Sequence, residues 1–453
     1  MTTTTTAPTR LSVSENKRYI VNEEGRPFFW LGDTAWSVFQ RLTREDASHY
    51  LADRAARGFT VIMAPALPPS GYRRLGRGLE TKNRYGELPL HDMDPRRPNA
   101  NWFDLVEYVI DAAAEAGLYV GLLPSWAEYV AAHDQWDTEI YGPVVFDPGS
   151  TRWYGEWIGA RFRDKTNLLW VLGGDRNPPG DEEAWRAMAE GIAYGVTGER
   201  PDWNEAHPAW ERLVMTYHAT GGYLSSSLSF HTDAWLGTNM IQTWAHEQNI
   251  IPHVKHDYDL TPPKPTIVGE PSYEGFIEGN PNTSSPWRVR YQAYWSLFTG
   301  AHGHVYGNHE IWPFSEKWRD ELAAPGADDM RHVRSLVESR PMLTRVPEYG
   351  MITSEAGEGH EIRLATRSSD GAYAFVYLTS GGAVAVDLAA LSGESANAYW
   401  YDPREGSAAT IGTFGGEGTR EFVAPSSGDD NDWVLVLDDA SRGFGVPGGG
   451  ARA

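Results

Sequence analysis

The sequence predicts an α/β protein in which a (β/α)8 TIM barrel is followed by a C-terminal antiparallel β-sandwich domain. Two observations indicate this fold. Short apolar runs alternate eight times with helical segments in the first three quarters of the chain. From Met342 onward the pattern changes to short alternating strands separated by Gly, Ser and Asp turns. An open, doubly wound sheet is the weaker alternative, because no G-x-G-x-x-G motif follows any of the eight runs.

The barrel elements follow one another in a regular order. The segment RYIVNEEGRPFF reads as a hairpin with its turn at Glu24-Gly25, and Thr43 to Asp46 has the form of a capping box before a helix. The predicted strands are one ending near Asp33, then Phe59–Leu67, Leu118–Trp126, Asn167–Gly173, Arg212–His218, Met240–Trp244, Pro265–Pro271 and His302–Asn308. The predicted helices are Asp46–Arg57, Trp102–Gly117, Thr151–Arg163, Glu182–Gly195, Pro286–Thr299 and Asp328–Ser339.

The chain is expected to have two domains and two tails. The barrel with its N-terminal hairpin spans residues 15–341. The sandwich spans residues 342–440, and its strands YAFVYLTS and DWVLVLDD are apolar enough to form a core, so we expect it to pack against the barrel instead of recruiting a polymer or collagen. The threonine-rich residues 1–14 and the glycine-rich residues 441–453 are expected to be disordered tails.

The composition excludes several classes of protein. The 453 residues carry 39 basic and 61 acidic side chains, a net charge of −22, and such a surface repels nucleic acid and anionic membranes. No run approaches the roughly 18 apolar residues of a transmembrane helix. The absence of cysteine excludes disulfides and a thiol nucleophile. The start of the chain has no apolar core of a secretory signal, so a cytoplasmic location is expected unless a leader precedes this sequence. A homo-oligomer is compatible with these features.

Two carboxylates stand directly after predicted strands. Asp175 follows the fourth strand in LLWVLGGDRNP, and Glu270 ends the seventh in PTIVGEP. Both strands end at the same mouth of a barrel, where barrels of this kind keep their chemistry. Such a pair suits glycoside hydrolysis, with one acid protonating the leaving oxygen and one carboxylate attacking or activating water. The alternatives are that each merely caps the following helix, or that both belong to a metal site.

The chain is rich in aromatic residues, with 19 Trp and 22 Tyr, and flat rings can stack on the apolar faces of sugars. Trp36 and Trp126, after the first and third strands, are candidates for such a platform or for ordinary core positions. Trp244 ends the sixth strand and is expected at the mouth. Tyr273, just after Glu270, is expected to orient that carboxylate or simply to pack.

Polar candidates lie at other strand ends. Asp33 ends the first strand and is expected either to bind a sugar hydroxyl or to cap the next turn. Glu128, after the third strand, is expected to contact substrate or to remain a solvated loop acid. His218 ends the fifth strand, where a structural histidine is the alternative to a substrate contact. Glu274 is a second candidate for orienting Glu270.

No metal and no cofactor are expected. The His-x-His at 302–304 and the HVKH at 253–256 are weak signals, and no H-E-x-x-H motif is present. Metal-dependent amidohydrolase barrels carry His-x-His at the end of the first strand, where this chain has Gly-Asp-Thr.

The motifs FFWLGDTAW, WVLGGDRNP, GEPSYEG and WYDPREG resemble those of the apiosidase-like glycoside hydrolases. That family was formerly described as a domain of unknown function, with a C-terminal part named for collagen binding. The resemblance covers about residues 15 to 440 and implies a barrel with an appended β-sandwich. It also implies a retaining mechanism with Glu270 as nucleophile and Asp175 as general acid/base. In the larger clan the strand-4 acid is usually Glu after Asn, whereas here it is Asp after Gly-Gly.

The resemblance implies a glycosidase that acts on a small glycoside or oligosaccharide. Its expected activity is the release of a terminal furanosyl sugar such as apiose, or a related sugar, from plant-derived substrates. The alternative is a non-catalytic carbohydrate- or collagen-binding protein on the same scaffold. Acids at both strand ends, Asp175 and Glu270, argue against that alternative because a binding protein does not need them.

Overall fold

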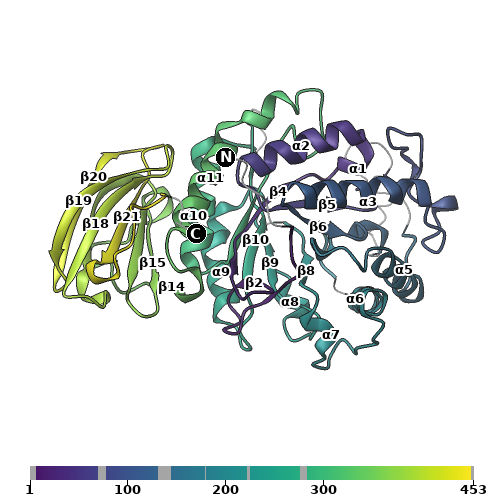
Figure 1. Ribbon diagram of the computed structural model, residues 1–453, viewed down its shortest axis with the longest axis horizontal. Coiled ribbons are helices and arrows are strands. Elements are labelled where there is room, and N and C mark those ends of the chain that lie inside the picture. The colour runs from purple at the N-terminus through teal and green to yellow at the C-terminus, as the bar shows by residue number, and fades with distance from the viewer. Residues whose placement is uncertain are drawn as a thin grey trace.

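A computed structural model describes residues 7–69, 78–130, 144–178, 180–221, 225–275 and 283–449 (Figure 1). Its first domain is a barrel of eight parallel strands: β4 (Trp30–Thr34), β5 (Val61–Pro65), β6 (Tyr119–Leu123), β7 (Leu168–Gly173), β8 (Met215–His218), β9 (Asn239–Gln242), β10 (Thr266–Glu270) and β13 (Gly303–Tyr306). Their order in the sheet is β8-β7-β6-β5-β4-β13-β10-β9. The predicted (β/α)8 fold is therefore confirmed, and each predicted strand is present.

The barrel closes between β8 and β9, the two ends of this order. The backbone N–H groups of Gly237 and Thr238, just before β9, both donate to the carbonyl of Met215 in β8, at 2.9 and 3.3 Å. The Thr216 hydroxyl also donates to the carbonyl of Thr238 at 2.8 Å. The strands are almost entirely buried, as expected for parallel strands covered by helices.

Helices cover the outside of the barrel. They are α1 (Val38–Arg41), α2 (Arg44–Ala56), α3 (Ala100–Glu115), α5 (Pro148–Arg161), α6 (Glu182–Thr197), α7 (Pro208–Glu211), α8 (Ser227–Phe230), α9 (Ile250–Asp259), α10 (Pro286–Thr299) and α11 (Pro325–Glu338). The side chain of Thr43 accepts a hydrogen bond from the Asp46 N–H at 3.2 Å, which is the Thr43 half of the predicted capping box of α2. Helix α9 was not predicted. It has a proline in its first turn, a position that tolerates proline.

Both chain ends are more ordered than predicted. Strands β1 (Leu11–Val13), β2 (Ile20–Asn22) and β3 (Pro27–Phe28) form an antiparallel sheet, in which β2 and β3 make the predicted hairpin. Because β1 pairs with β2, the prediction of a disordered tail through residue 14 is wrong for β1. At the other end, the ring of Phe444 packs on Tyr373, with ring centroids 6.4 Å apart, so part of the predicted C-terminal tail is ordered.

The C-terminal domain is a β-sandwich. Its strands are β14 (Arg345–Pro347), β15 (Arg363–Ser368), β16 (Tyr373–Leu378), β17 (Gly381–Asp387), β18 (Ser395–Asp402), β19 (Ser407–Gly415), β20 (Thr419–Ser427) and β21 (Trp433–Asp439). Six of them form one antiparallel sheet in the order β14-β15-β16-β21-β18-β19, and β17 pairs with β20. Val376, Leu435 and Phe422, from the two sheets, belong to one buried core.

The barrel domain also contains a short pair of strands, β11 (Tyr273–Glu274) and β12 (Thr283–Ser284), which lies between β10 and α10 in the chain.

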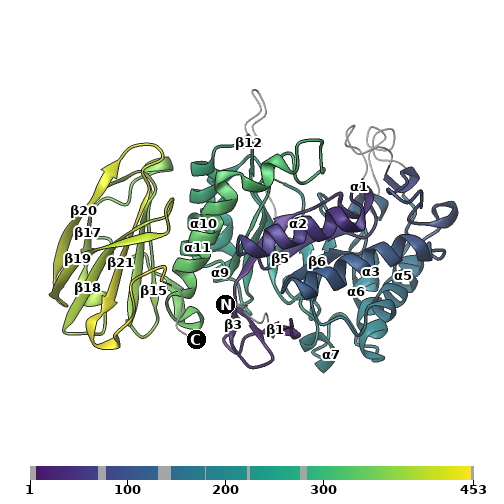
Figure 2. The same ribbon diagram turned by 45° about the horizontal axis from the view of Figure 1, so that its top comes forward.

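The larger sheet of the sandwich packs on barrel helices α10 and α11 (Figures 1 and 2). Tyr294 of α10 stacks on Tyr377 of β16, with ring centroids 4.5 Å apart. Phe298, one turn later, lies over Phe375 with a centroid distance of 6.2 Å. The sandwich therefore packs against the barrel through an aromatic interface, as the apolar strands predicted.

A buried ion cluster crosses the same interface. Arg290 of α10 donates to both carboxylate oxygens of Asp432, at 2.6 and 2.9 Å, and to Asp329 of α11 at 2.7 Å. Asp430 accepts a further bond from Arg290 at 2.7 Å. Burial raises the pKa of Asp329 to about 7, although Arg290 opposes this rise. These partners satisfy the guanidinium, so its burial costs far less than that of an unpaired charge.

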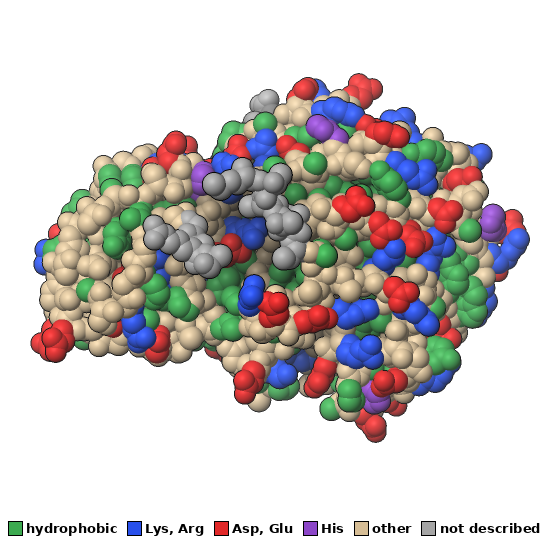
Figure 3. Space-filling view, viewed as in Figure 1, with side chains coloured by type: hydrophobic (Ala, Val, Ile, Leu, Met, Phe, Trp, Pro, Cys, Tyr) green, Lys and Arg blue, Asp and Glu red, His purple; other side chains and the backbone are tan. Residues whose placement is uncertain are grey.

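The surface carries charges of both signs. Figure 3 shows acidic and basic side chains interspersed over the face drawn, so the net charge of −22 is not gathered into one patch there. Within the part of the chain that the structure describes, no helix is both long and apolar enough to cross a membrane.

Candidate active site

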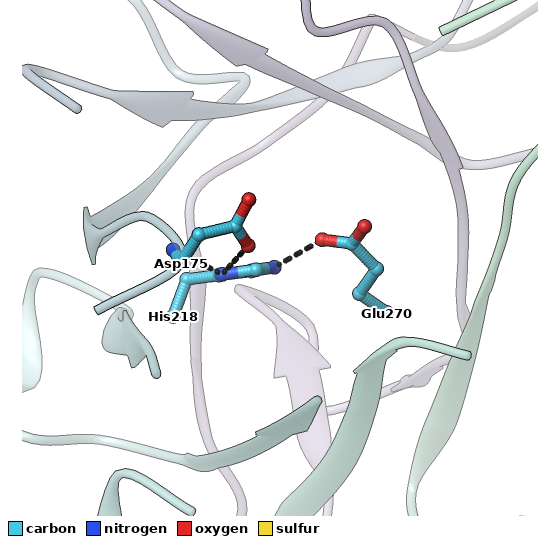
Figure 4. A group of neighbouring side chains, drawn as sticks. All are labelled: Asp175, His218 and Glu270. Carbon is cyan, nitrogen blue, oxygen red and sulfur yellow. Dashed lines mark hydrogen bonds and ion pairs between the residues drawn. The ribbon is translucent and has the colours of Figure 1, made fainter. Parts of the chain in front are cut away.

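Three titratable side chains meet at the C-terminal mouth of the barrel (Figure 4). Asp175 follows β7, His218 is the last residue of β8, and Glu270 is the last residue of β10. Each offers one oxygen or nitrogen atom, and these atoms lie within 4.8 Å of one another. The structure thus brings together the two predicted carboxylates and the histidine predicted at the same mouth.

A turn with unusual backbone angles presents Asp175. Gly173, Gly174 and Asp175 all have positive φ, at 86°, 125° and 53°. Glycine adopts such angles without strain, and aspartate is among the few other residues that tolerate the left-handed region. A Cβ on Gly174 would lie 2.7 Å from the ring of Trp126, so a larger residue does not fit. The chain therefore needs both glycines to place this carboxylate.

Glu270 is nearly enclosed, with 5% of its surface exposed. The Tyr273 hydroxyl donates to Oε1 at 2.5 Å, and Trp36 Nε1 donates to the Tyr273 oxygen at 2.7 Å. His218 Nε2 lies 3.0 Å from Oε2. Burial raises the pKa of Glu270, and the charge of Asp175 raises it further. Contacts with His218 and Tyr273 oppose this rise by stabilising the ionised carboxylate.

His218 lies between the two carboxylates. Its Nδ1 is 3.8 Å from Asp175 Oδ1, and its Nε2 faces Glu270. Burial lowers the pKa of His218, but the close contact with the Glu270 carboxylate and the charge of Asp175 outweigh burial, so the pKa is raised. His218 therefore keeps its proton to a higher pH than an ordinary histidine does. It is a member of the site and not an isolated structural histidine.

Asp175 is the more open of the two carboxylates, with 25% of its side chain exposed. Gln242, the last residue of β9, donates from Nε2 to Asp175 Oδ1 at 2.8 Å and so orients the carboxylate. Gln242 was not among the predicted site residues. The sixth strand was predicted to run on to Trp244, so no signal in the sequence placed Gln242 at a strand end.

Trp36 and Trp126 form a wall of the site. Their rings pack edge to face with centroids 5.3 Å apart, and they lie 5.6 and 6.2 Å from the ring of His218. Both side chains are almost fully buried. Neither offers the open ring face that the predicted stacking platform requires, because each ring is packed against its neighbours.

Trp244, in contrast, is 41% exposed. Its φ of 47° is uncommon for a bulky residue. The strand of Glu270 holds it in place, because the Trp244 N–H donates to the Glu270 carbonyl at 3.1 Å and the Trp244 carbonyl accepts from Ser272 Oγ at 2.6 Å. Backbone strain of this kind tends to occur at functional positions. The ring is thus accessible while its backbone is tied to the strand of the buried carboxylate.

Asp33 does not reach the site, which corrects the prediction that it binds a sugar hydroxyl. It is fully buried, accepts a hydrogen bond from the Tyr50 hydroxyl at 2.7 Å and lies 3.5 Å from Arg54 Nη1. Burial raises the pKa of Asp33 to about 6, although Arg54 opposes this effect. Since both partners belong to α2, Asp33 joins β4 to that helix and has a structural role.

The other two predicted acids are also buried. Glu274 accepts hydrogen bonds from the Tyr306 hydroxyl at 2.6 Å and from the Gly326 N–H at 2.8 Å. Gly326 lies in the first turn of α11, where a carboxylate is favourable, so Glu274 anchors that helix and does not orient Glu270. Glu128 is buried after β6 and is not a solvated loop acid. Its contact with substrate stays a prediction.

The Asp175, His218 and Glu270 donors are close enough to hold a metal ion. However, each ring nitrogen of His218 faces a different carboxylate. This arrangement fits proton sharing, whereas a metal requires the donors to point at a common centre. His302 and His304 are fully buried elsewhere in the barrel, and burial lowers the pKa of both to about 3. The predicted absence of a metal remains a prediction.

A (β/α)8 barrel with two close carboxylates after its fourth and seventh strands is the arrangement of a glycoside hydrolase, and solved structures similar to this chain carry that description. The chain belongs to the apiosidase-like family, because residues 14–344 match the family model described as "Apiosidase-like, catalytic domain". Residues 346–438 match a second model, "Putative collagen-binding domain of a collagenase". The resemblance seen in the sequence is confirmed, and the protein is a glycosidase instead of the non-catalytic alternative.

Two solved structures are similar to the chain over almost its whole length. One, described as "Glycoside hydrolase", is 29% identical over 96% of this chain and 99% of its own, with a TM-score of 0.81. The other is a glycoside hydrolase family 5 protein from Bacteroides vulgatus, 29% identical over 95% of this chain and 94% of its own, with a TM-score of 0.82. A GH30 endoxylanase from Clostridium papyrosolvens, 11% identical over 95% of this chain and 100% of its own with a TM-score of 0.52, is similar in fold alone. No curated protein matches the chain.

Proposed function

We propose that the protein is a retaining glycosidase that removes a terminal furanosyl sugar, apiose or a related sugar, from small plant-derived glycosides or oligosaccharides. Membership of the apiosidase-like family supports the choice of sugar. The observation that carries the mechanism is the closeness of Asp175 and Glu270: one oxygen of each carboxylate lies within 4.8 Å of the other, which favours the shorter of the two separations that glycosidases use. Retaining enzymes hold their two carboxyl groups about 5–5.5 Å apart, whereas inverting enzymes need about 6.5–9.5 Å to admit a water.

Glu270 is the proposed nucleophile. Its ionised oxygen attacks the anomeric carbon while Asp175 gives its proton to the leaving oxygen, and a glycosyl ester forms on Glu270. Asp175, now ionised, takes a proton from water, which cleaves the ester with overall retention. Tyr273 and His218 support this assignment because both contact the Glu270 carboxylate and favour its charge. The greater exposure of Asp175 supports its place on the side where the leaving group departs and water enters.

The sugar and the stereochemical outcome can be tested together on a panel of aryl furanosides and pyranosides. We expect an aryl furanoside, with apiofuranosides included in the panel, to be the best substrate. Proton NMR of the first product should show the anomer that the substrate had, as a double displacement requires. Initial release of the opposite anomer would rule out retention, and activity confined to pyranosides would rule out the furanosyl substrate.

Replacing His218 with glutamine is expected to move the acid limb of kcat/KM to higher pH. This limb reports ionisation of Glu270 in the free enzyme, and the pKa of Glu270 is raised by burial and by Asp175. His218 opposes that rise, so removing its charge leaves Glu270 protonated up to a higher pH. The measurement is the pH profile of kcat/KM with an aryl substrate, and His253→Gln on α9 is the matched control. The prediction is contradicted if the acid limb of His218→Gln stays in place or moves to lower pH.

A further inference from the structure

Helix α10 connects the sandwich to the mouth of the barrel. On the sandwich side, two of its tryptophans bind the same residue. Trp287 Nε1 donates to the carbonyl of Thr379 at 3.2 Å, and Trp295 Nε1 donates to the Thr379 hydroxyl at 2.9 Å. Thr379 directly follows β16. Contacts about two helical turns apart therefore fix α10 against the sandwich.

The same helix binds the loop that follows β9. Arg288 pairs with Glu247 and donates to the carbonyl of Ala245 at 3.5 Å. This loop begins next to the exposed Trp244, one residue before Ala245. Helix α10 thus holds the segment that carries the accessible ring at the mouth.

Gln292 of α10 binds the neighbouring loop, which follows β10. Its Oε1 accepts a hydrogen bond from the Ser272 N–H at 3.0 Å. Ser272 lies two residues after Glu270, and its hydroxyl donates to the Trp244 carbonyl at 2.6 Å. The two mouth loops are therefore bonded both to each other and to α10.

Tyr291 is the point at which the sandwich and the mouth loop meet. Its hydroxyl donates to Glu247 Oε1 at 3.3 Å and lies 3.1 Å from Nε2 of His360, a residue of the sandwich. The rings of Tyr291 and His360 also pack, with centroids 5.1 Å apart. A side chain of the sandwich thus reaches, through one tyrosine, the carboxylate that anchors the loop of Trp244.

We propose that the sandwich domain positions the active site: His360 and Tyr291 fix the loop that carries Trp244, and Trp244 binds a sugar ring of the substrate. Tyr291 and His360 are positioning residues, because neither lies among the groups that react. The role of Trp244 rests on the proposed function, in which a sugar enters this mouth. A loosened loop weakens binding of ground state and transition state alike, so it raises KM and leaves kcat nearly unchanged.

Tyr291→Phe removes the hydroxyl and keeps the ring. We expect KM for a natural glycoside to rise about two- to tenfold, the range for one lost hydrogen bond, with kcat and Tm close to those of the unchanged chain. His360→Ala, made from the sandwich side, should raise KM in the same way. Tyr294→Phe is the matched control: it lies on the same helix, is buried, and its hydroxyl has no hydrogen-bond partner among the described residues.

A double-mutant cycle tests whether Tyr291 affects KM by positioning Trp244. Trp244→Ala alone should raise KM more than Tyr291→Phe does, and Tyr291→Phe should have no further effect in the Trp244→Ala background. The proposal is overturned if Tyr291→Phe and His360→Ala match the control in KM, with or without a fall in Tm, or if the Tyr291→Phe effect persists without Trp244. A wrong proposed function would be recognised separately, because it would show as no activity on the furanosides of the sugar panel or as full activity of Glu270→Ala.

Discussion

Replacing Glu270 with alanine is expected to abolish turnover of natural and activated glycosides alike, by more than about 10⁴-fold, the order of loss when a covalent nucleophile is removed. The attacking oxygen is lost, whereas its donors Tyr273 and His218 remain around the vacated space. Because those donors favour negative charge, a small anion such as azide can bind there and attack the anomeric carbon. An activated aryl glycoside should then yield a glycosyl azide of inverted configuration.

The activity of the companion variant Asp175→Ala should depend strongly on the leaving group, whereas Glu270→Ala should be inactive whatever the leaving group. An aryl glycoside with a good leaving group needs little protonation, so its rate of glycosyl-ester formation should be largely spared. Natural glycosides should lose about 10²-fold or more, because their leaving oxygen departs only with a proton. Exogenous azide should accelerate breakdown of the ester in this variant, because azide needs no general base, and the product should have retained configuration.

The measurement is the loss on an activated aryl substrate compared with the loss on a natural one, for each variant, with NMR of the azide products. Glu274→Gln is the control, because Glu274 is a buried carboxylate bonded to the start of α11 and not to the site. It should lower Tm and leave kcat nearly unchanged. If Asp175→Ala is equally inactive on both substrates while Glu270→Ala keeps the activated one, the two roles are reversed.

The position of the site was predictable because it depends on strand ends. A buried parallel strand leaves a continuous apolar run in the sequence, and the residue that follows the run is easy to locate. Since all barrel strands end at one face, Asp175, His218, Glu270 and Trp244 were expected to share a mouth before their contacts were known. The structure brings the first three of these residues together and ties the fourth to the strand of Glu270.

The side chains from other helices and strands that contact these strand-end residues could not be predicted from the sequence. Asp33 is the last residue but one of β4, close to the end of its strand as Asp175 is, yet Arg54 and Tyr50 of α2 enclose it. The Gly-Gly turn before Asp175 is a local difference between the two aspartates, but the enclosure of Asp33 depends on tertiary packing that no local pattern records. Gln242 was missed for the converse reason, since an amide at a strand end becomes part of a site only when its strand places it beside Asp175.

Ending the chain at Pro341, which removes the sandwich, is expected to leave a barrel that aggregates or melts more than about 10 °C lower. Helices α10 and α11 would expose the face that now packs on the larger sheet, including Tyr294, Trp295 and Phe298. Burial of each such side chain contributes about 1.5–3 kcal/mol, or roughly 4.5–9 kcal/mol for the three. That loss is comparable with the entire stability of a typical domain, about 5–15 kcal/mol.

The measurement combines Tm, size-exclusion chromatography and kcat for the truncated and full-length chains, with binding of both to collagen and to plant polysaccharide. Asp432→Asn is the milder control, because it keeps the domain and weakens only the contacts of this carboxylate with Tyr377 and with Arg290, which retains Asp329. It should lower Tm by less than the truncation does. A truncated barrel that remains monomeric, keeps its Tm and kcat, and loses only polymer binding would show that the sandwich recruits a polymer and does not support the barrel.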